Sequence, residues 1–304
     1  DYIADKQPAD LERLCSILAV QPIQPWHILA ITFTNKAANE LRSRLLQAIG
    51  EECASMLHAS TFHSACVRIL RRSISKLGYD SNFTIYDTDD SQRLMKSCIA
   101  DADVSEKQFP PRAVLTEISL AKDRMCSPEY FCIEAGSDYR KMVIGKLYKE
   151  YQNRLKSANA LDFDDLIYKT VELLESFPEE LEYYQNRFRY IMVDEYQDTN
   201  HAQFRLVQLL SQKHQNLCVV GDDDQSIYRF RGATIENILN FEKQFQNAVV
   251  IRLEQNYRST KTILEAANDV IAHNAGRKEK TLWTDLEDGK KIIWYKAVDE
   301  TDES

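Results

Sequence analysis

Four short runs rich in β-branched residues, each ending in polar side chains, constrain the fold of this chain most strongly. They are HILAITFT (27–34), RYIMVDE (189–195), NLCVVGDDD (216–224) and AVVIRLE (248–254). Helical patterns lie between them, at Asn35–Ile49, Thr61–Leu77, Phe163–Ser176 and His201–Leu210. Apolar strands that alternate with helices are typical of a parallel sheet covered on both faces. The sequence therefore predicts an α/β fold with a parallel sheet flanked by helices.

Residues 84–159 show a different pattern, in which apolar residues recur at helical spacing and no strand is expected. Prolines divide this segment into short helices. We expect an all-helical insertion between two halves of the sheet domain. Its last third is basic, which fits either a solvated helix face or a surface that faces nucleic acid. The basic residues are Arg140, Lys141, Lys146, Lys149, Arg154 and Lys156.

Composition limits the class of protein. The net charge of −9 argues against a simple basic coat for nucleic acid but leaves room for a local basic groove. Seven scattered cysteines without a C-x-x-C pair argue against a zinc site or a disulfide framework. They favour a reducing, cytoplasmic compartment. The sequence has no apolar run of the roughly 18 residues that a membrane helix needs, so no membrane partner is expected.

The segment IMVDEYQDTNHAQ (191–203) places three carboxylates within five positions, directly behind a predicted buried strand. Charge this dense is costly there unless a cation is bound. In parallel sheets, ligands bind beyond the carboxyl ends of the strands. Asp194 therefore suits a Mg²⁺ ligand, directly or through water, and Glu195 suits a base that deprotonates an attacking water. Taken alone, the pair also fits an exposed acidic turn.

Polar and aromatic residues follow two further predicted strands. Gln225 is placed to sense a terminal phosphate through its side-chain amide. In LEQNYRST (253–260), Tyr257 can stack on a base and Arg258 can reach the charge that develops on a phosphate during hydrolysis. Aromatic and basic groups alternate just after Gln225, as on surfaces that stack on bases and pair with phosphates. A core aromatic pair with solvated arginines is the alternative for these residues, which are Tyr228, Phe230 and Arg231.

Two segments, ITFTNKAANELRSRL and STFHSACVRILRR, each pass from a polar turn into a helix. In the first, Thr32, Asn35 and the free amides of the helix start can bond phosphates, and Phe33 can stack. The second repeats the pattern with Thr61 and His63. For His63 we expect a structural, hydrogen-bonded role rather than catalysis.

The segment ALDFDDLI (160–167) places three aspartates around a predicted helix start. The helix dipole favours negative charge at that end, so we expect these aspartates to cap the helix.

The chain resembles the UvrD/Rep-type helicases of superfamily 1 over essentially its whole length. The resemblance rests on six segments, in the family's order: ILAITFTNKAANEL, TFHSACVRIL, ALDFDDLI, VDEYQDTNHAQ, VVGDDDQSIYRFRGA and LEQNYRST. One such match arises by chance, but six in order do not. The resemblance implies a RecA-like domain of the P-loop NTPase type. It also implies an ATP- and Mg²⁺-dependent motor that moves 3′ to 5′ along single-stranded DNA and opens single-strand/duplex junctions.

The resemblance also assigns roles to residues at the matching positions. Asp194 and Glu195 become the metal-site and water-activating carboxylates, and Gln225 couples the γ-phosphate to DNA. Tyr257 stacks on adenine, and Arg258 contacts the γ-phosphate. The DNA path includes Thr32, Phe33, Asn35, Thr61, His63, Tyr228, Phe230 and Arg231. Many relatives have tryptophan at the position of Phe230, so the stacking face is smaller here.

The resemblance divides the chain into three parts. Residues 1–83 and 160–252 correspond to the first motor domain, 84–159 to its helical insertion, and 253–304 to the start of a second motor domain. The family's phosphate loop, G-x-x-x-x-G-K-[ST], is expected about twenty residues before ILAITF. At that distance the chain has DYIADKQP, in which Lys6 falls near the lysine position but the glycines are absent.

Two explanations of this departure remain open: the sequence begins after or skips the true loop, or the loop is degenerate. The later family motifs are also absent, so we expect this chain by itself to be inactive or weakly active. Two other functions stay open as well. One is a catalytically silent scaffold that binds DNA, and the other is the motor part of a helicase–nuclease. A metal nuclease within the chain is a remote third possibility.

Overall fold

The computed structural model describes residues 23–226, 232–274, 280–293 and 295–296. The chain divides into two compact units. Unit 1 comprises Asp1–Glu195 and Asn200–Val220, and unit 2 comprises Tyr196–Thr199 and Gly221–Ser304. No helix in the described ranges combines the length and the apolar character needed to cross a membrane.

A parallel sheet of four strands forms the centre of unit 1. Its strands are β1 (Ile28–Thr32), β2 (His58–Thr61), β5 (Tyr190–Val193) and β6 (Leu217–Val219), in the order β2-β1-β5-β6. The register places Ile31 opposite both Ser60 and Val193. Successive residues of β1, Leu29, Ala30 and Ile31, are all buried, as expected for a central strand with helices on both faces. The predicted α/β fold with a parallel sheet is confirmed.

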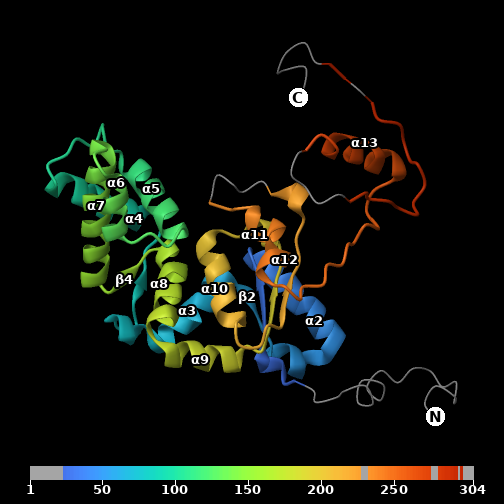
Figure 1. Ribbon diagram of the computed structural model, residues 1–304, viewed down its shortest axis with the longest axis horizontal. Coiled ribbons are helices and arrows are strands. Elements are labelled where there is room, and N and C mark those ends of the chain that lie inside the picture. Colours follow the sequence, from blue (N-terminus) through green and yellow to red (C-terminus); the bar gives the residue numbers. More distant parts are fainter. Residues whose placement is uncertain (1–22, 227–231, 275–279, 294, 297–304) are drawn as a thin grey trace. The chain divides into compact units, whose positions relative to one another are not determined.

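The connections between the strands make this sheet doubly wound. Helix α2 (Asn35–Met56) joins β1 to β2, and α10 (His201–Ser211) joins β5 to β6. The two connections run in opposite directions across the sheet, so right-handed crossovers place the two helices on opposite faces, as Figure 1 shows. The strand order therefore reverses between β1 and β5. Ligand sites of open α/β sheets lie at such a switch point.

Three further helices pack around this sheet or beside it: α3 (Phe62–Ser73), α8 (Phe163–Ser176) and α9 (Pro178–Arg187). Short 3₁₀ turns occur at Pro25–His27 and Ile74–Leu77. The predicted helix starts at Asn35, Phe163 and His201 are confirmed. Thr61 belongs instead to β2, and its side chain caps α3.

Residues 88–157 fold into four helices around a core of their own. The helices are α4 (Thr88–Asp101), α5 (Pro111–Asp123), α6 (Pro128–Ala135) and α7 (Tyr139–Ser157). Fully buried tyrosines of α7, Tyr148 and Tyr151, stand in this core. The segment begins and ends side by side, because β3 (Thr84–Ile85) pairs in parallel with β4 (Ala160–Leu161). The two-residue β3 departs from the expectation of no strand.

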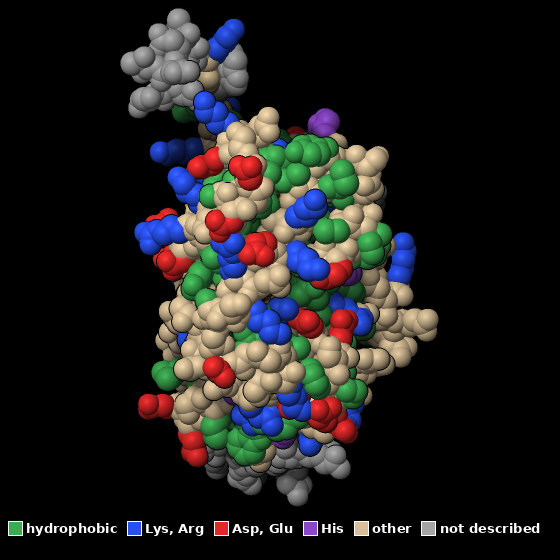
Figure 2. Space-filling model, turned by 90° about the vertical axis from the view of Figure 1, so that its left-hand side faces the viewer, with side chains coloured by type: hydrophobic (Ala, Val, Ile, Leu, Met, Phe, Trp, Pro, Cys, Tyr) green, Lys and Arg blue, Asp and Glu red, His purple; other side chains and the backbone are tan. Residues whose placement is uncertain are grey.

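The basic side chains of α7 are largely paired with acidic or carbonyl groups of this unit. The Arg154 guanidinium lies 2.7 Å from a Glu150 oxygen and 2.8 Å from an Asp101 oxygen. The Arg140 guanidinium donates to the carbonyl of Gln108 over 2.9 Å. On the face drawn in Figure 2, Lys and Arg side chains lie among Asp and Glu side chains. This arrangement supports the alternative of a solvated helix face.

One predicted strand is absent from the described residues, and one observed strand was not predicted. Residues 248–254 form no strand in the described chain, and Val249, Ile251 and Leu253 are 85%, 79% and 80% exposed. A β-branched run becomes a strand only when another strand pairs with it, and the first described pairing here is that of Gln255 with Trp283. Strand β2 was missed: its four residues run directly into α3, and its last residue, Thr61, was predicted to begin that helix.

Unit 2 is built from short elements. They are 3₁₀ turns at Tyr196–Asp198 and Asp223–Gln225, and helices α11 (Glu236–Leu239), α12 (Phe241–Gln244) and α13 (Lys261–Ile271). The Tyr196 ring meets the Phe241 ring edge-on at 5.8 Å. The Asn237 amide donates to the carbonyl of Thr199 over 3.0 Å. These contacts tie residues 196–199 to unit 2 rather than to the flanking unit 1 segments.

Candidate functional site

Two helices of unit 1 begin directly after neighbouring strands of the sheet. Thr34 caps α2 by accepting a hydrogen bond from the amide of Ala37 over 3.1 Å. Thr61 caps α3 by accepting one from the amide of Ser64 over 3.3 Å. The positive ends of both helix dipoles therefore lie at the carboxyl edge of the sheet. Such an edge favours anionic ligands.

The threonines predicted to contact DNA have local structural roles that the sequence did not reveal. Thr32 is 2% exposed, and its hydroxyl donates to the carbonyl of Thr34 over 3.2 Å. Thr61 is 7% exposed and also donates to the hydroxyl of Ser64 over 2.9 Å. Asn35, the first residue of α2, is exposed. The DNA contacts of these three residues stay predictions.

Aromatic rings follow the same two strands. The Phe33 ring, after β1, meets the Phe62 ring edge-on at 5.5 Å. The His63 ring stacks on the Phe163 ring with centroids 3.8 Å apart. Burial lowers the pKa of His63 to about 4, so this imidazole is neutral at pH 7. The observed stacking fits the expected structural role of His63.

The low pKa of His63 predicts an acid-sensitive contribution to stability. Because the folded pKa lies below the usual 6.5, the contribution is fully present above pH 6.5 and is lost as the pH falls to about 4. The loss should reach about 3 kcal/mol of unfolding free energy. It is measured as the difference between wild type and His63→Gln, in which nothing titrates at this position. An NMR titration of the His63 ring with a midpoint near 6.5 would contradict the assignment.

Asp194 and Glu195 follow β5 at the switch point. The amide of Asp194 donates to the carbonyl of Ile31 over 3.0 Å, which joins the start of this turn to β1. An Asp194 carboxylate oxygen accepts a hydrogen bond from the amide of Glu195 over 3.0 Å. Burial raises the pKa of Asp194 above its usual value. An exposed carboxylate at a ligand-binding edge has the oxygen chemistry that a hard divalent cation requires, so this donor fits Mg²⁺.

The backbone of Glu195 lies in the left-handed region, with φ of +50°. For a residue with a Cβ this conformation costs about 1–2 kcal/mol. Strained residues of this kind cluster at functional sites, where the surrounding structure holds a side chain in a required direction. The turn therefore fixes the direction of the Cα–Cβ bond of Glu195 at the switch point.

The loop after β6 depends on a glycine. A Cβ at Gly221 would lie 2.5 Å from the side-chain oxygen of Gln197 and 3.2 Å from the amide nitrogen of Tyr196. Gln197 is 1% exposed, and its side-chain oxygen accepts a hydrogen bond from the amide of Asp222 over 3.0 Å. Close backbone approach thus fixes the start of the loop within unit 2.

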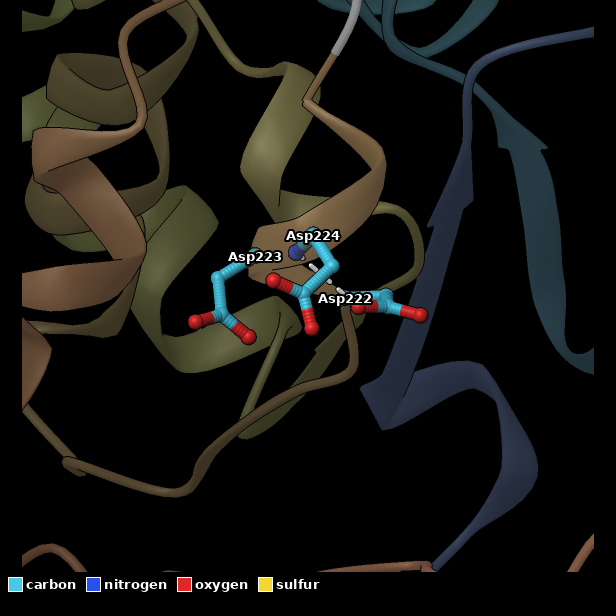
Figure 3. Close-up of side chains that lie close together, drawn as sticks. All are labelled: Asp222, Asp223 and Asp224. Atoms are coloured by element: carbon cyan, nitrogen blue, oxygen red, sulfur yellow. Dashed lines mark hydrogen bonds between the residues drawn. The ribbon is translucent and has the colours of Figure 1, made fainter. Parts of the chain in front are cut away.

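Gln225 lies in this loop, beside three aspartates that the sequence had not singled out. Figure 3 shows the carboxylates of Asp222, Asp223 and Asp224 close together, and ligand oxygens of all three lie within 4.8 Å of one another. The Gln225 amide donates to an Asp222 carboxylate oxygen over 2.6 Å. The side chain that was predicted to sense a phosphate is therefore held by Asp222 in this structure.

Tyr257 and Arg258 sit on an exposed turn of unit 2. The side-chain oxygen of Asn256 accepts hydrogen bonds from the amides of Arg258 and Ser259 over 2.9 and 2.8 Å. Tyr257 is 79% exposed, and its hydroxyl donates to Gln255 over 2.8 Å. The turn presents an aromatic ring and a guanidinium group to solvent, where a ligand can reach them.

The predicted site residues fall into three groups. Unit 1 holds Asp194 and Glu195 together with Thr32, Phe33, Asn35, Thr61 and His63, all at or just beyond the carboxyl ends of strands of one sheet. Unit 2 holds Gln225, Tyr257 and Arg258. The remaining four, Lys6, Tyr228, Phe230 and Arg231, lie outside the described residues.

A buried ion cluster at the start of α8 was also missed. Asp162 and Asp165 form a reciprocal capping box there, so the capping prediction is confirmed for these two residues. The Lys122 ammonium lies 2.7 Å from an Asp162 oxygen and 2.9 Å from an Asp165 oxygen. The two partners are far apart in the chain, and no spacing rule links a lysine on α5 to a cap on α8.

Comparison with known proteins assigns the family. The model of the UvrD/REP helicase N-terminal domain matches residues 11–246, and that of the UvrD-like helicase C-terminal domain matches residues 251–304. The ATP-dependent DNA helicase PcrA of Bacillus subtilis is 51% identical over 288 residues, covering 95% of this chain and 39% of that relative. The PcrA proteins of Staphylococcus epidermidis and Staphylococcus aureus are 51% and 50% identical over 292 residues.

The chain spans about two fifths of the length of these relatives, 39% to 40%. The N-terminal family model nevertheless covers most of the chain, from the first strand of the sheet to the end of α12. The matched range includes both carboxylates at the switch point and the loop that carries Gln225. The chain belongs to the UvrD/Rep family of DNA helicases.

Proposed function

We propose that the protein containing this chain is an ATP-dependent DNA helicase that moves 3′ to 5′ on single-stranded DNA and opens single-strand/duplex junctions. The observation that carries the proposal is the position of Asp194 and Glu195 at the switch point of a doubly wound parallel sheet. Relatives that are half identical to this chain are named ATP-dependent DNA helicases. Six free cysteines among the described residues accord with a cytoplasmic location.

We propose three structural parts for this motor. Residues 1–83 and 160–252 would form the first motor domain, and residues 84–159 its helical insertion. The pairing of β3 with β4, where the insertion leaves and returns, supports these limits. Residues 253–304 would begin the second motor domain. With Lys6 in place of a complete phosphate loop, this chain by itself would be inactive or weakly active.

The two carboxylates at the switch point would have different roles in ATP hydrolysis. Asp194 would hold Mg²⁺, which when bound neutralises phosphate charge. Glu195 would accept a proton from the attacking water at its carboxylate, and its fixed backbone would set the direction of its Cα–Cβ bond. Gln225 would bind the γ-phosphate through its amide after leaving Asp222.

Residues of unit 2 and of the strand ends would bind the remaining groups. Tyr257 would stack on adenine, and Arg258 would pair with the γ-phosphate from the exposed turn. Single-stranded DNA would pass along the residues that follow β1 and β2, where aromatic rings and helix starts lie together. That path would include Thr32, Phe33, Asn35, Thr61, His63, Tyr228, Phe230 and Arg231.

Strand displacement by the full-length protein tests this function. We expect ATP and Mg²⁺ to support displacement from a duplex with a 3′ single-stranded tail, and little displacement from one with a 5′ tail, because the motor enters on the tail it tracks. A fluorescent strand reports release, and EDTA should stop it. DNA binding that no nucleotide alters, without ATP hydrolysis, would favour the scaffold alternative. Shortened labelled strands would favour a helicase–nuclease.

A further inference from the structure

A cluster of four charged residues in unit 2 has no role in the proposed function. The Lys280 ammonium lies 3.0 Å from an Asp223 oxygen and 3.3 Å from an Asp224 oxygen, and it also pairs with Asp222. The side chain of Lys280 is 19% exposed, while those of Asp223 and Asp224 are 9% and 8% exposed. Three adjacent carboxylates repel one another, so the ammonium allows them to stand close together.

Asp222 connects this cluster to Gln225. One oxygen of its carboxylate accepts the Gln225 side-chain amide over 2.6 Å, and the other accepts the amide of Asp224 over 3.0 Å. The backbone amide of Gln225 donates to the carbonyl of Asp222 over 3.0 Å. The direction of Asp222 therefore sets both the 3₁₀ turn at Asp223–Gln225 and the direction of the glutamine amide.

The pKa shifts agree with a charged pair. Burial raises the pKa of Asp222, but hydrogen bonds from Lys280 and Gln225 outweigh it and hold that pKa below the usual value. Burial likewise lowers the pKa of Lys280, and hydrogen bonds to Asp222 and Asp223 raise it above the usual value. Both groups are ionised at neutral pH. The ammonium already occupies the carboxylate cluster, which therefore gives no support for a metal site.

We propose that Lys280 is a positioning residue. Through its ion pair with Asp222, it fixes the position of the turn that carries Gln225. The inference rests on the proposed function, in which Gln225 binds the γ-phosphate. Gln225 lies in the part of the chain that matches the N-terminal family domain, and Lys280 lies in the part that matches the C-terminal domain. The ion pair thus joins the phosphate-sensing loop to a segment of the second domain. Movement of that segment would release or restrain the Gln225 amide.

Kinetics of the full-length protein test this role. Lys280→Gln should lower kcat for DNA-stimulated ATP hydrolysis by about tenfold, with a smaller change in KM for ATP, because the turn from which Gln225 reaches the phosphate loses the charge-assisted pair that holds Asp222. Lys280→Arg should restore most of the rate, because guanidinium also pairs with carboxylates. Lys291→Gln makes the same charge change at an exposed site of unit 2 and should behave as wild type. Equal rates in Lys280→Gln and wild type would overturn the proposal.

Amide exchange provides a test that needs neither ATP nor DNA. In Lys280→Gln, the amides of Asp224 and Gln225 should exchange about tenfold faster than in wild type, because Asp222 no longer holds the turn. Lys280→Arg should restore slow exchange. Unchanged exchange in Lys280→Gln would refute the positioning role even if the helicase is active. Wild-type protein without ATP hydrolysis but with the expected exchange pattern would instead refute the proposed function alone.

Discussion

Glu195→Gln should remove nearly all DNA-stimulated ATP hydrolysis from the full-length protein. The proposed role of Glu195 is to take a proton from the attacking water, and an amide of the same size cannot accept that proton. Loss of a positioned general base lowers kcat by about 10² to 10⁴-fold. Steady-state ATP hydrolysis with saturating single-stranded DNA measures the effect. Binding of single-stranded DNA should be retained, because the substitution leaves the turn and the strand ends unchanged.

The control separates chemistry from folding. Glutamine occupies the left-handed conformation at position 195 as readily as glutamate does, so the urea midpoint of the variant should match that of wild type. Glu265→Gln makes the same chemical change on the exposed surface of α13 and should leave turnover intact. Normal turnover in Glu195→Gln would show that another group activates the water, and the assignment of the base would be wrong.

The fold was predictable wherever local composition decides structure. Buried parallel strands need continuous apolar, β-branched residues, and this requirement revealed β1, β5 and β6. The same composition failed at 248–254, because pairing with a neighbouring strand cannot be read from the run itself. It also failed at β2, where Ser60 and Thr61 leave only a weak apolar signal before the helix. Whether a run of residues forms a strand depends on the neighbouring strands that pair with it, and the whole fold decides which strands are neighbours.

In the candidate site, too, local features were predicted and contacts between distant residues were not. Asp162 was predicted as a cap because a cap contacts residues a few positions away. Asp194 and Glu195 were predicted because the end of a buried strand is a local feature. The ionic partners were not predicted: Lys280 meets Asp222 across 58 positions of sequence, and Lys122 meets Asp162 across 40. Local spacing carries no information about contacts over such separations.

The Lys122 cluster predicts the largest stability effect in the chain. The Lys122 side chain is 1% exposed and that of Asp165 is fully buried, so Lys122→Met would leave the carboxylates without their cation. Tyr151 and Gln152 donate one hydrogen bond each to Asp162 and Asp165, which is too little to replace a full charge. Removing one partner of a buried pair costs about 3–5 kcal/mol. Equilibrium urea unfolding followed by circular dichroism measures the loss, and Lys107→Met on the exposed surface provides the control.

The pH dependence distinguishes lost charge pairing from lost packing. Burial raises the pKa of Asp165 to about 6, with a further increase from Asp162, and Lys122 opposes both. Without Lys122 that pKa rises further. A carboxyl with a raised folded pKa contributes stability at low pH and loses it as the pH rises through that pKa. The deficit of Lys122→Met should therefore shrink between pH 8 and pH 5, and adding Asp165→Asn should recover part of the loss at pH 8. A deficit that stays constant across this range would mean that Lys122 acts through packing of its methylene chain, and the electrostatic explanation would fail.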